Sequence, residues 1–267
     1  MAATLTGAAI LGGFAAVPAQ AQGRLEAHYE ATLSGIPIGK GGLKVDIAED
    51  QFKVSADGGT AGLVSVFSTG KGTMISEGRI VKGSLSPINF ERKLTTKGTE
   101  TIRMSLAGGN VRDFSIDPEP SKDSKDIPVT EAHKRGVLDP MTAVLIRVGG
   151  AGEMIGPDGC NSGPPVFDGR MRFEVKLGYK RIENISIKGY RGPVVVCSAQ
   201  FVPVAGYNPE RPAMKYLAGL RDAEIWFAPL AGTRLLTGVK VIIPTPLGKG
   251  ILSATQFSST AAVTRAQ

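Results

Sequence analysis

The chain of 267 residues has few of the side chains that carry out most protein chemistry: it contains two histidines, two cysteines and one tryptophan. With only His28 and His133, little capacity for proton transfer near neutral pH is available. No Gly-x-Ser-x-Gly motif accompanies them, and no set of three metal ligands has workable spacing. We therefore expect no catalytic, cofactor-binding or metal-binding residues, and we predict a protein that is not an enzyme.

Long apolar runs are also missing after the first residues. Residues 1–21 are small and apolar, end in Ala19-Gln20-Ala21 and contain no positive charge. This pattern predicts a signal peptide that is cleaved between Ala21 and Gln22, with a start codon assigned too late or a trimmed sequence accounting for the missing charge. We expect an exported, periplasmic protein without a transmembrane span.

The two cysteines, Cys160 and Cys197, do not have the Cys-x-x-Cys spacing of redox and metal sites. In the oxidising compartment that the leader predicts, an isolated pair is most simply one disulfide.

The net charge of +7 does not come from a dense cluster of basic residues, since Lys and Arg alternate with Asp and Glu along most of the predicted strands. The few aromatic residues do not interleave with basic ones, so we expect no nucleic-acid binding. A basic exported protein is attracted to anionic envelope surfaces such as acidic lipids or peptidoglycan, although the charge could equally serve only to solvate the surface.

Glycine and proline are abundant, with 35 and 17 residues spread along the chain as turn signals. They separate about a dozen short segments in which apolar and polar residues alternate, the pattern of half-buried strands. The clearest example runs through Met171, Phe173, Val175 and Leu177. The predicted fold is all-β: an antiparallel sheet that is curved, or an open barrel that resembles a half-barrel, with one central α-helix.

That helix is predicted over Asp139 to Val148. Asp139 is a favourable N-cap, Pro140 suits the first helical position, and Gly149-Gly150 would end the helix. Its apolar residues recur at helical spacing: Met141, Val144, Leu145 and Val148. The helix either plugs the interior of the sheet or forms a lid over an open cavity.

The predicted organisation is a single β domain over 22–259. Its two halves, about 24–135 and 150–258, are joined by the helix 139–148 and followed by a loose tail over 260–267. Residues 57–72 could form a helical turn or a flap. A short strand is expected at 127–129 and a helical turn at 214–220.

Three Gly/Pro motifs resemble a family of exported proteobacterial proteins known as domain of unknown function 3108. The motifs are Gly35-Ile36-Pro37-Ile38-Gly39, Leu138-Asp139-Pro140 and Pro246-Leu247-Gly248, and the resemblance spans about Arg24 to Phe257. It implies an envelope-located β protein of unassigned activity, and it supplies no catalytic residues.

Three functional hypotheses follow. The leading one is a periplasmic, non-enzymatic protein that binds an apolar or amphipathic ligand such as a lipid, or an envelope partner, in the concavity of the sheet. The second is a structural or interaction protein that docks on anionic envelope surfaces. The third is a carboxylate-dependent hydrolase that uses a pair such as Asp46 with Glu49 or Asp222 with Glu224.

Overall fold

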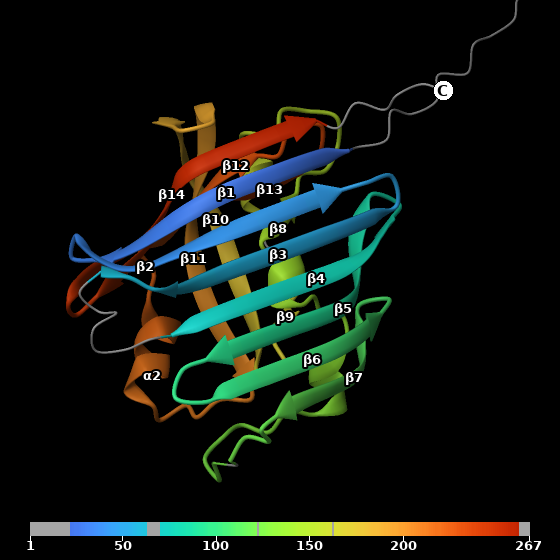
Figure 1. The fold of residues 1–267 in the computed structure, drawn as a ribbon, viewed down its shortest axis with the longest axis vertical. Coiled ribbons are helices and arrows are strands. Elements are labelled where there is room, and N and C mark those ends of the chain that lie inside the picture. Colours follow the sequence, from blue (N-terminus) through green and yellow to red (C-terminus); the bar gives the residue numbers. More distant parts are fainter. Residues whose placement is uncertain (1–21, 63–69, 122, 162, 262–267) are drawn as a thin grey trace, which may run out of the picture.

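The computed structural model describes residues 22–62, 70–121, 123–161 and 163–261. These residues form one antiparallel sheet of 14 strands that does not close into a barrel (Figure 1). The predicted signal peptide 1–21 lies outside them, as do 63–69 of the undecided segment 57–72. The first seven strands are β1 (Gly23–Leu33), β2 (Ile36–Ile47), β3 (Gln51–Thr60), β4 (Lys71–Val81), β5 (Ser84–Thr95), β6 (Thr99–Ala107) and β7 (Asn110–Asp117).

The second part of the chain contributes the remaining strands and two short α-helices. The helices are α1 (Pro140–Ala143) and α2 (Pro212–Gly219). The strands are β8 (Leu145–Arg147), β9 (Val166–Phe167), β10 (Arg172–Ile187), β11 (Tyr190–Ala205), β12 (Ala223–Pro229), β13 (Leu235–Thr245) and β14 (Gly248–Ala261).

The sheet is continuous across the two predicted halves. Its order is β7-β6-β5-β4-β3-β2-β1-β14-β13-β12-β11-β10-β9, and β8 pairs with β13. The first strand pairs with the last along its whole length, from Gly23 against Ala261 to Leu33 against Gly250. The halves are therefore joined by backbone hydrogen bonds of the sheet itself as well as by the chain between β7 and β8.

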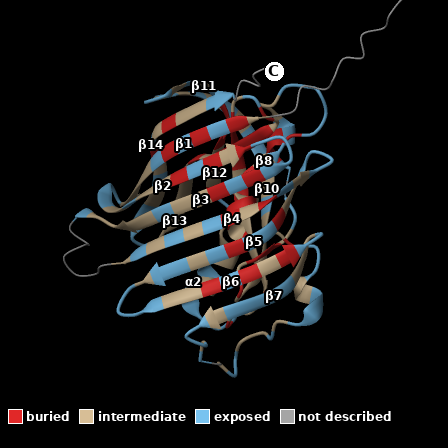
Figure 2. Cartoon of the chain, turned by 45° about the vertical axis from the view of Figure 1, so that its right-hand side comes forward, coloured by how far each residue is buried: buried red, intermediate tan, exposed pale blue. Residues whose placement is uncertain are grey.

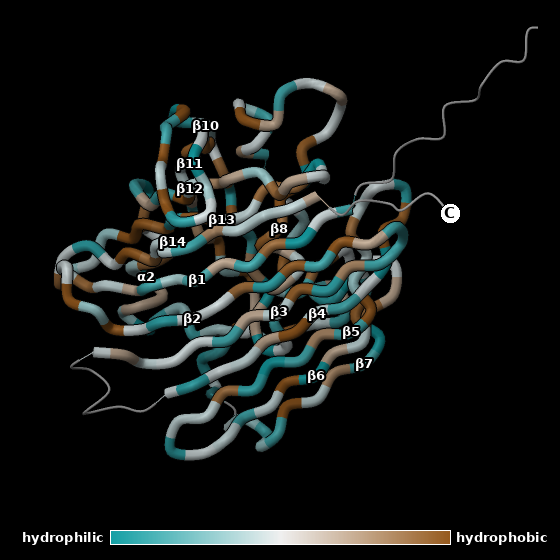
Figure 3. Tube along the Cα trace, turned by 45° about the horizontal axis from the view of Figure 1, so that its top comes forward, coloured by the Kyte–Doolittle hydropathy of each residue, from teal (hydrophilic) through white to brown (hydrophobic). Residues whose placement is uncertain are grey.

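The strands follow the predicted alternation, because successive side chains of a strand point to opposite faces. Leu25 and Ala27 of β1 are buried while Arg24 and Glu26 are exposed. Figure 2 shows the same alternation of buried and exposed residues along the front strands, and Figure 3 shows it as alternating hydropathy. The predicted all-β antiparallel fold is confirmed.

The predicted helix 139–148 is wrong in its extent. Helix α1 ends at Ala143, and Leu145–Arg147 is a strand that pairs with Leu235–Thr237 of β13. The segment Val144-Leu145-Ile146 contains two β-branched residues, which suit a strand, and β13 offers unpaired backbone groups there. Tertiary pairing therefore replaces the last five residues of the predicted helix, about one and a half turns.

Three smaller expectations also differ from the structure. Residues 127–129 form no strand, although Ile127 exchanges two backbone hydrogen bonds with Gly206 and Tyr207. The helical turn expected at 214–220 is the two-turn helix α2, so α1 is not the single helix. The tail is shorter than predicted, because β14 continues to Ala261.

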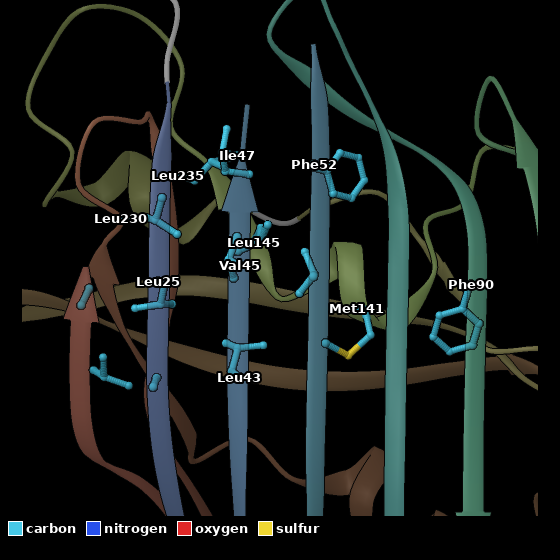
Figure 4. Close-up of a cluster of buried hydrophobic side chains, with 14 of the residues drawn as sticks. Leu25, Leu43, Val45, Ile47, Phe52, Phe90, Met141, Leu145, Leu230 and Leu235 are labelled. Carbon is cyan, nitrogen blue, oxygen red and sulfur yellow. The ribbon is translucent and has the colours of Figure 1, made fainter. Parts of the chain in front are cut away.

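The main core lies between the strands of the first half and the segment of α1 and β8. Figure 4 shows large side chains of β1, β2, β3 and β5 facing Met141 and Leu145. Both of these residues are buried. This part of the interior is filled, as the plug hypothesis requires, while Met141 and Leu145 also border the cavity described below.

Cys160 and Cys197 form a disulfide, as predicted. The bond lies in a second, smaller cluster of buried side chains that includes Val148, Val195 and Leu236. It ties the loop after β8 to the centre of β11.

Candidate functional site

Beside the filled core lies a cavity of about 800 Å³ that is partly open to solvent. A volume of this size is within the range of small-molecule binding sites. Among the described residues that line it, six have polar side chains and the others are apolar or glycine. The six are Tyr29, Lys40, Asp57, Arg147, Asn161 and Thr237.

One wall of the cavity is built from very small residues. It includes Ala31 of β1, Gly39 and Gly41 of β2, and Ala56 and Gly58 of β3. Farther along β2 and β3, buried large residues fill the core instead (Figure 4). The space therefore exists because the same strands change from large to small inward-facing residues.

Gly41 shows why part of this wall has no side chains. A Cβ at this position would lie 2.5 Å from the backbone oxygen of Asp57 on β3, closer than non-bonded atoms can approach. Glycine is thus required for the close packing of β2 against β3 at the cavity.

The opposite wall carries larger apolar side chains. Phe173, Val175 and Leu177 of β10 and Ile225 and Phe227 of β12 line it. The alternation in β10 was the clearest strand signal in the sequence. The structure shows that this inward face borders a cavity rather than a filled core.

The cavity also contains a tethered hydroxyl. Tyr29 of β1 donates a hydrogen bond of 2.7 Å to the backbone oxygen of Gly238 on β13. Burial raises the pKa of the Tyr29 phenol, so the group stays protonated over the physiological range. Its oxygen can still accept a hydrogen bond from a ligand.

Asp139 and Pro140 start helix α1, as predicted: Asp139 is its N-cap and Pro140 its first residue. This start lies at the edge of the cavity. The Oδ1 atom of Asp139 accepts hydrogen bonds from the backbone N–H groups of Met141 and Thr142, at 2.9 and 3.0 Å. Its Oδ2 atom accepts from the hydroxyls of Ser76 and Thr142, at 2.9 and 2.6 Å. The buried carboxyl thereby connects α1 to β4.

Burial is the largest influence on Asp139 and raises the pKa of its carboxyl, although the four hydrogen bonds act in the opposite direction. Pro140, next to it, lines the cavity. The network is thus a structural support for the cavity wall.

The carboxylate pairs of the hydrolase hypothesis lie elsewhere. Asp46 accepts a hydrogen bond of 2.6 Å from exposed Arg24. Glu224 accepts hydrogen bonds from Arg181, Lys180 and the indole of Trp226, and the Arg181 bonds, the largest influence, hold its pKa at about 2. None of the four predicted carboxylates is among the described residues that line the cavity.

The remaining predicted residues fall outside the cavity as well. The Nε2 atom of exposed His28 lies 3.7 Å from Oε1 of Glu26. The Nδ1 atom of His133 accepts a hydrogen bond from the backbone N–H of Thr130, at the start of a short 3₁₀ helix over Glu131–Lys134. Of the predicted cleavage site, Ala21 lies outside the described residues, and Gln22 directly precedes β1. Among the residues that the structure describes, no group of three His, Cys, Asp or Glu is arranged to hold a metal ion.

Sequence reasoning did not identify the cavity residues Tyr29 and Gly238 or the wall of small residues. One signal was present, because Gly39 and Gly41 occupy alternate positions of a strand whose later alternate positions are Leu43, Val45 and Ile47. Which opposite wall faces these glycines is decided only by the folding of the sheet.

Comparison with known proteins places the chain beside proteins of unassigned activity. The model of a family described as a protein of unknown function (DUF3108) matches residues 28–255. No curated protein is significantly similar in sequence. The crystal structure of a beta-barrel-like protein of domain of unknown function DUF1849 from Brucella abortus aligns with a TM-score of 0.49 and 9% identity, covering 90% of this chain and 98% of that one.

Within the described part of the chain, no helix has the length and apolar character needed to cross a bilayer.

Proposed function

Since the chain belongs to the DUF3108 family of proteins of unknown function, we propose its function from its own geometry: it binds an apolar or amphipathic small molecule in the cavity between β1–β3 and β10–β13. The observation that carries this proposal is the cavity of about 800 Å³, whose walls are mainly apolar side chains and glycine with six polar side chains among them. Apolar surface that a ligand covers is removed from water, which favours binding by about 25 cal/mol per Å² before the costs of association.

The proposal is one of binding rather than catalysis. Apolar walls with a small number of polar groups are typical of sites that hold a ligand and orient it. The hydroxyl of Tyr29 is one such polar group, and it favours a ligand with a hydrogen-bond donor over a pure hydrocarbon.

Filling the cavity is expected to abolish binding without unfolding the protein. Gly238 lines the cavity, and a Cβ there would have one near neighbour, Ile225 Cγ2, at an ordinary distance of 3.7 Å. In Gly238→Phe the ring would occupy the space of the ligand. We expect the affinity for a dansyl-labelled undecanoic acid, measured by fluorescence titration, to fall at least about tenfold, a change of about 1.4 kcal/mol.

The matched control is Gly98→Phe, at the exposed turn between β5 and β6, where a Cβ meets nothing within 4 Å. It should bind the probe like the wild type. Native mass spectrometry of the protein isolated from its own cells should in addition detect a co-purifying apolar molecule that Gly238→Phe lacks. A wild type that binds no probe and carries no such molecule would refute the proposal.

We place this binding function in the periplasm. The disulfide between Cys160 and Cys197 supports that location, because such bonds persist in oxidising compartments. Protein recovered from the periplasm should begin at Gln22 on N-terminal sequencing, with both cysteines oxidised on non-reducing peptide mapping. An uncleaved leader or free thiols at both positions would count against this location.

A further inference from the structure

We propose that the paired ends of the hairpins β1–β2 and β13–β14 dock on a lipid bilayer with anionic headgroups and so place the cavity mouth at the membrane. We define this hairpin-tip surface as residues 34–38 and 246–249. It contains Pro246-Leu247-Gly248 and the first four residues of Gly35-Ile36-Pro37-Ile38-Gly39, two of the three Gly/Pro motifs that marked the family resemblance. The fold brings them together.

Hydrogen bonds between the two tips hold the surface in one shape. The backbone N–H of Ser34 donates to the backbone oxygen of Lys249 at 3.0 Å, and the hydroxyl of Ser34 donates to the backbone oxygen of Leu247. Figure 1 shows the blue and red turns side by side at the left. The apolar residues of the tips therefore stay in a fixed arrangement.

The tips expose large apolar side chains. Leu247 is 74% exposed, more than any other large hydrophobic residue described, and Ile36 is 52% exposed. Single exposed apolar residues are common on protein surfaces. Here two of them stand on hydrogen-bonded neighbouring turns, where both can enter a bilayer together.

The charge of the surface suits an anionic membrane. Within the two tip segments, all of whose residues are described, Lys249 is the single charged residue. Helix α2 lies next to them, since the hydroxyl of Tyr216 donates to the backbone oxygen of Pro244 at 3.1 Å, and the one charged residue of that helix is Lys215. Basic residues that flank inserted apolar side chains are attracted to acidic headgroups.

The tips are continuous with the cavity. Ala31 pairs with Gly39 on one side and with Leu252 on the other, and all three line the cavity. Gly39 follows directly after the tip residue Ile38, and Leu252 is 40% exposed. A membrane bound at the tips would thus face the end of the cavity through which an apolar molecule could enter, a consequence that rests on the proposed function.

Flotation with vesicles tests the docking surface. The wild type should float with vesicles of phosphatidylethanolamine and phosphatidylglycerol, and less so with phosphatidylcholine alone or at high salt. The double variant Ile36→Asp/Leu247→Asp should lose at least about tenfold in vesicle affinity. The matched control Val81→Asp/Ile88→Asp adds the same two charges at residues 52% and 40% exposed, away from the tips, and should bind like the wild type.

Three results would overturn the docking proposal. They are a wild type that does not float with anionic vesicles, an equal loss in both double variants, and a tip-dependent dimer in sedimentation equilibrium that accounts for the exposed residues. Gly238→Phe separates this proposal from the cavity function, because it should lose the fluorescent probe and retain vesicle binding.

Discussion

Replacing Leu145 by aspartate is expected to leave the protein unfolded. Leu145 is 5% exposed, pairs with Thr237 of β13 and belongs to the main core together with Met141. Loss of a buried leucine side chain costs about 2–5 kcal/mol, and a carboxyl placed among apolar groups adds several more. The sum reaches the total stability of an ordinary domain, about 5–15 kcal/mol.

Circular dichroism and thermal unfolding measure this effect. The control is Leu247→Asp, the same change at a leucine that is 74% exposed, which should unfold within a few degrees of the wild type. A cooperative transition near that of the wild type in Leu145→Asp would mean that α1 and β8 form a movable lid. The burial of Leu145 and its pairing with β13 favour the plug.

Asp139→Ala is expected to lower the free energy of unfolding by about 3 kcal/mol. The change removes the N-cap of α1, which accounts for about 1 kcal/mol. It also takes an acceptor from the buried hydroxyls of Ser76 and Thr142, at about 1–3 kcal/mol for an unsatisfied group. Asp139→Asn keeps a side-chain oxygen for the backbone N–H groups and should lose far less. Urea denaturation of the three proteins provides the comparison.

The same pair predicts a pH dependence. The pKa of Asp139 is higher in the folded protein than in the unfolded chain, so the folded state holds this proton more tightly. Its contribution to stability is therefore fully present below the unfolded pKa, about 3.9, and is lost as the pH rises through the folded pKa. Relative to Asp139→Asn, the wild type should become less stable as the pH rises from about 4 through the raised pKa of the folded state. A difference that is constant or grows in favour of the wild type would contradict the raised pKa.

Much of the architecture could be predicted because its causes are local. The alternation in β1 and β10 reports burial on one face of a strand, and it was visible without knowledge of the partner strands. The start of α1 was equally predictable, since Asp139 caps backbone groups two and three residues ahead of it. The resemblance to the DUF3108 family, carried by short Gly/Pro motifs, is confirmed by the match over 28–255.

The end of α1 could not be predicted from its own residues. Of the four residues on the predicted apolar face, Met141, Leu145 and Val148 are buried and Val144 is half-buried. The prediction of burial was right, but the prediction of a helix over 144–148 was wrong. Hydrophobic spacing indicates which side chains are removed from water, and it does not indicate which segment the backbone will pair with. That partner, β13, lies about ninety residues later in the chain.

The sequence alone was enough to predict the strands, the start of α1, the disulfide between Cys160 and Cys197, and the family. Each of these depends on a local pattern or on a single pair of residues. Other features were decided only by the tertiary structure. The segment of α1 and β8 fills one part of the interior, and small residues of β1–β3 face large ones of β10 and β12 across a cavity. Two turns that are distant in the sequence form one exposed surface. These features depend on contacts between segments far apart in the chain, and no local pattern encodes which segments will meet.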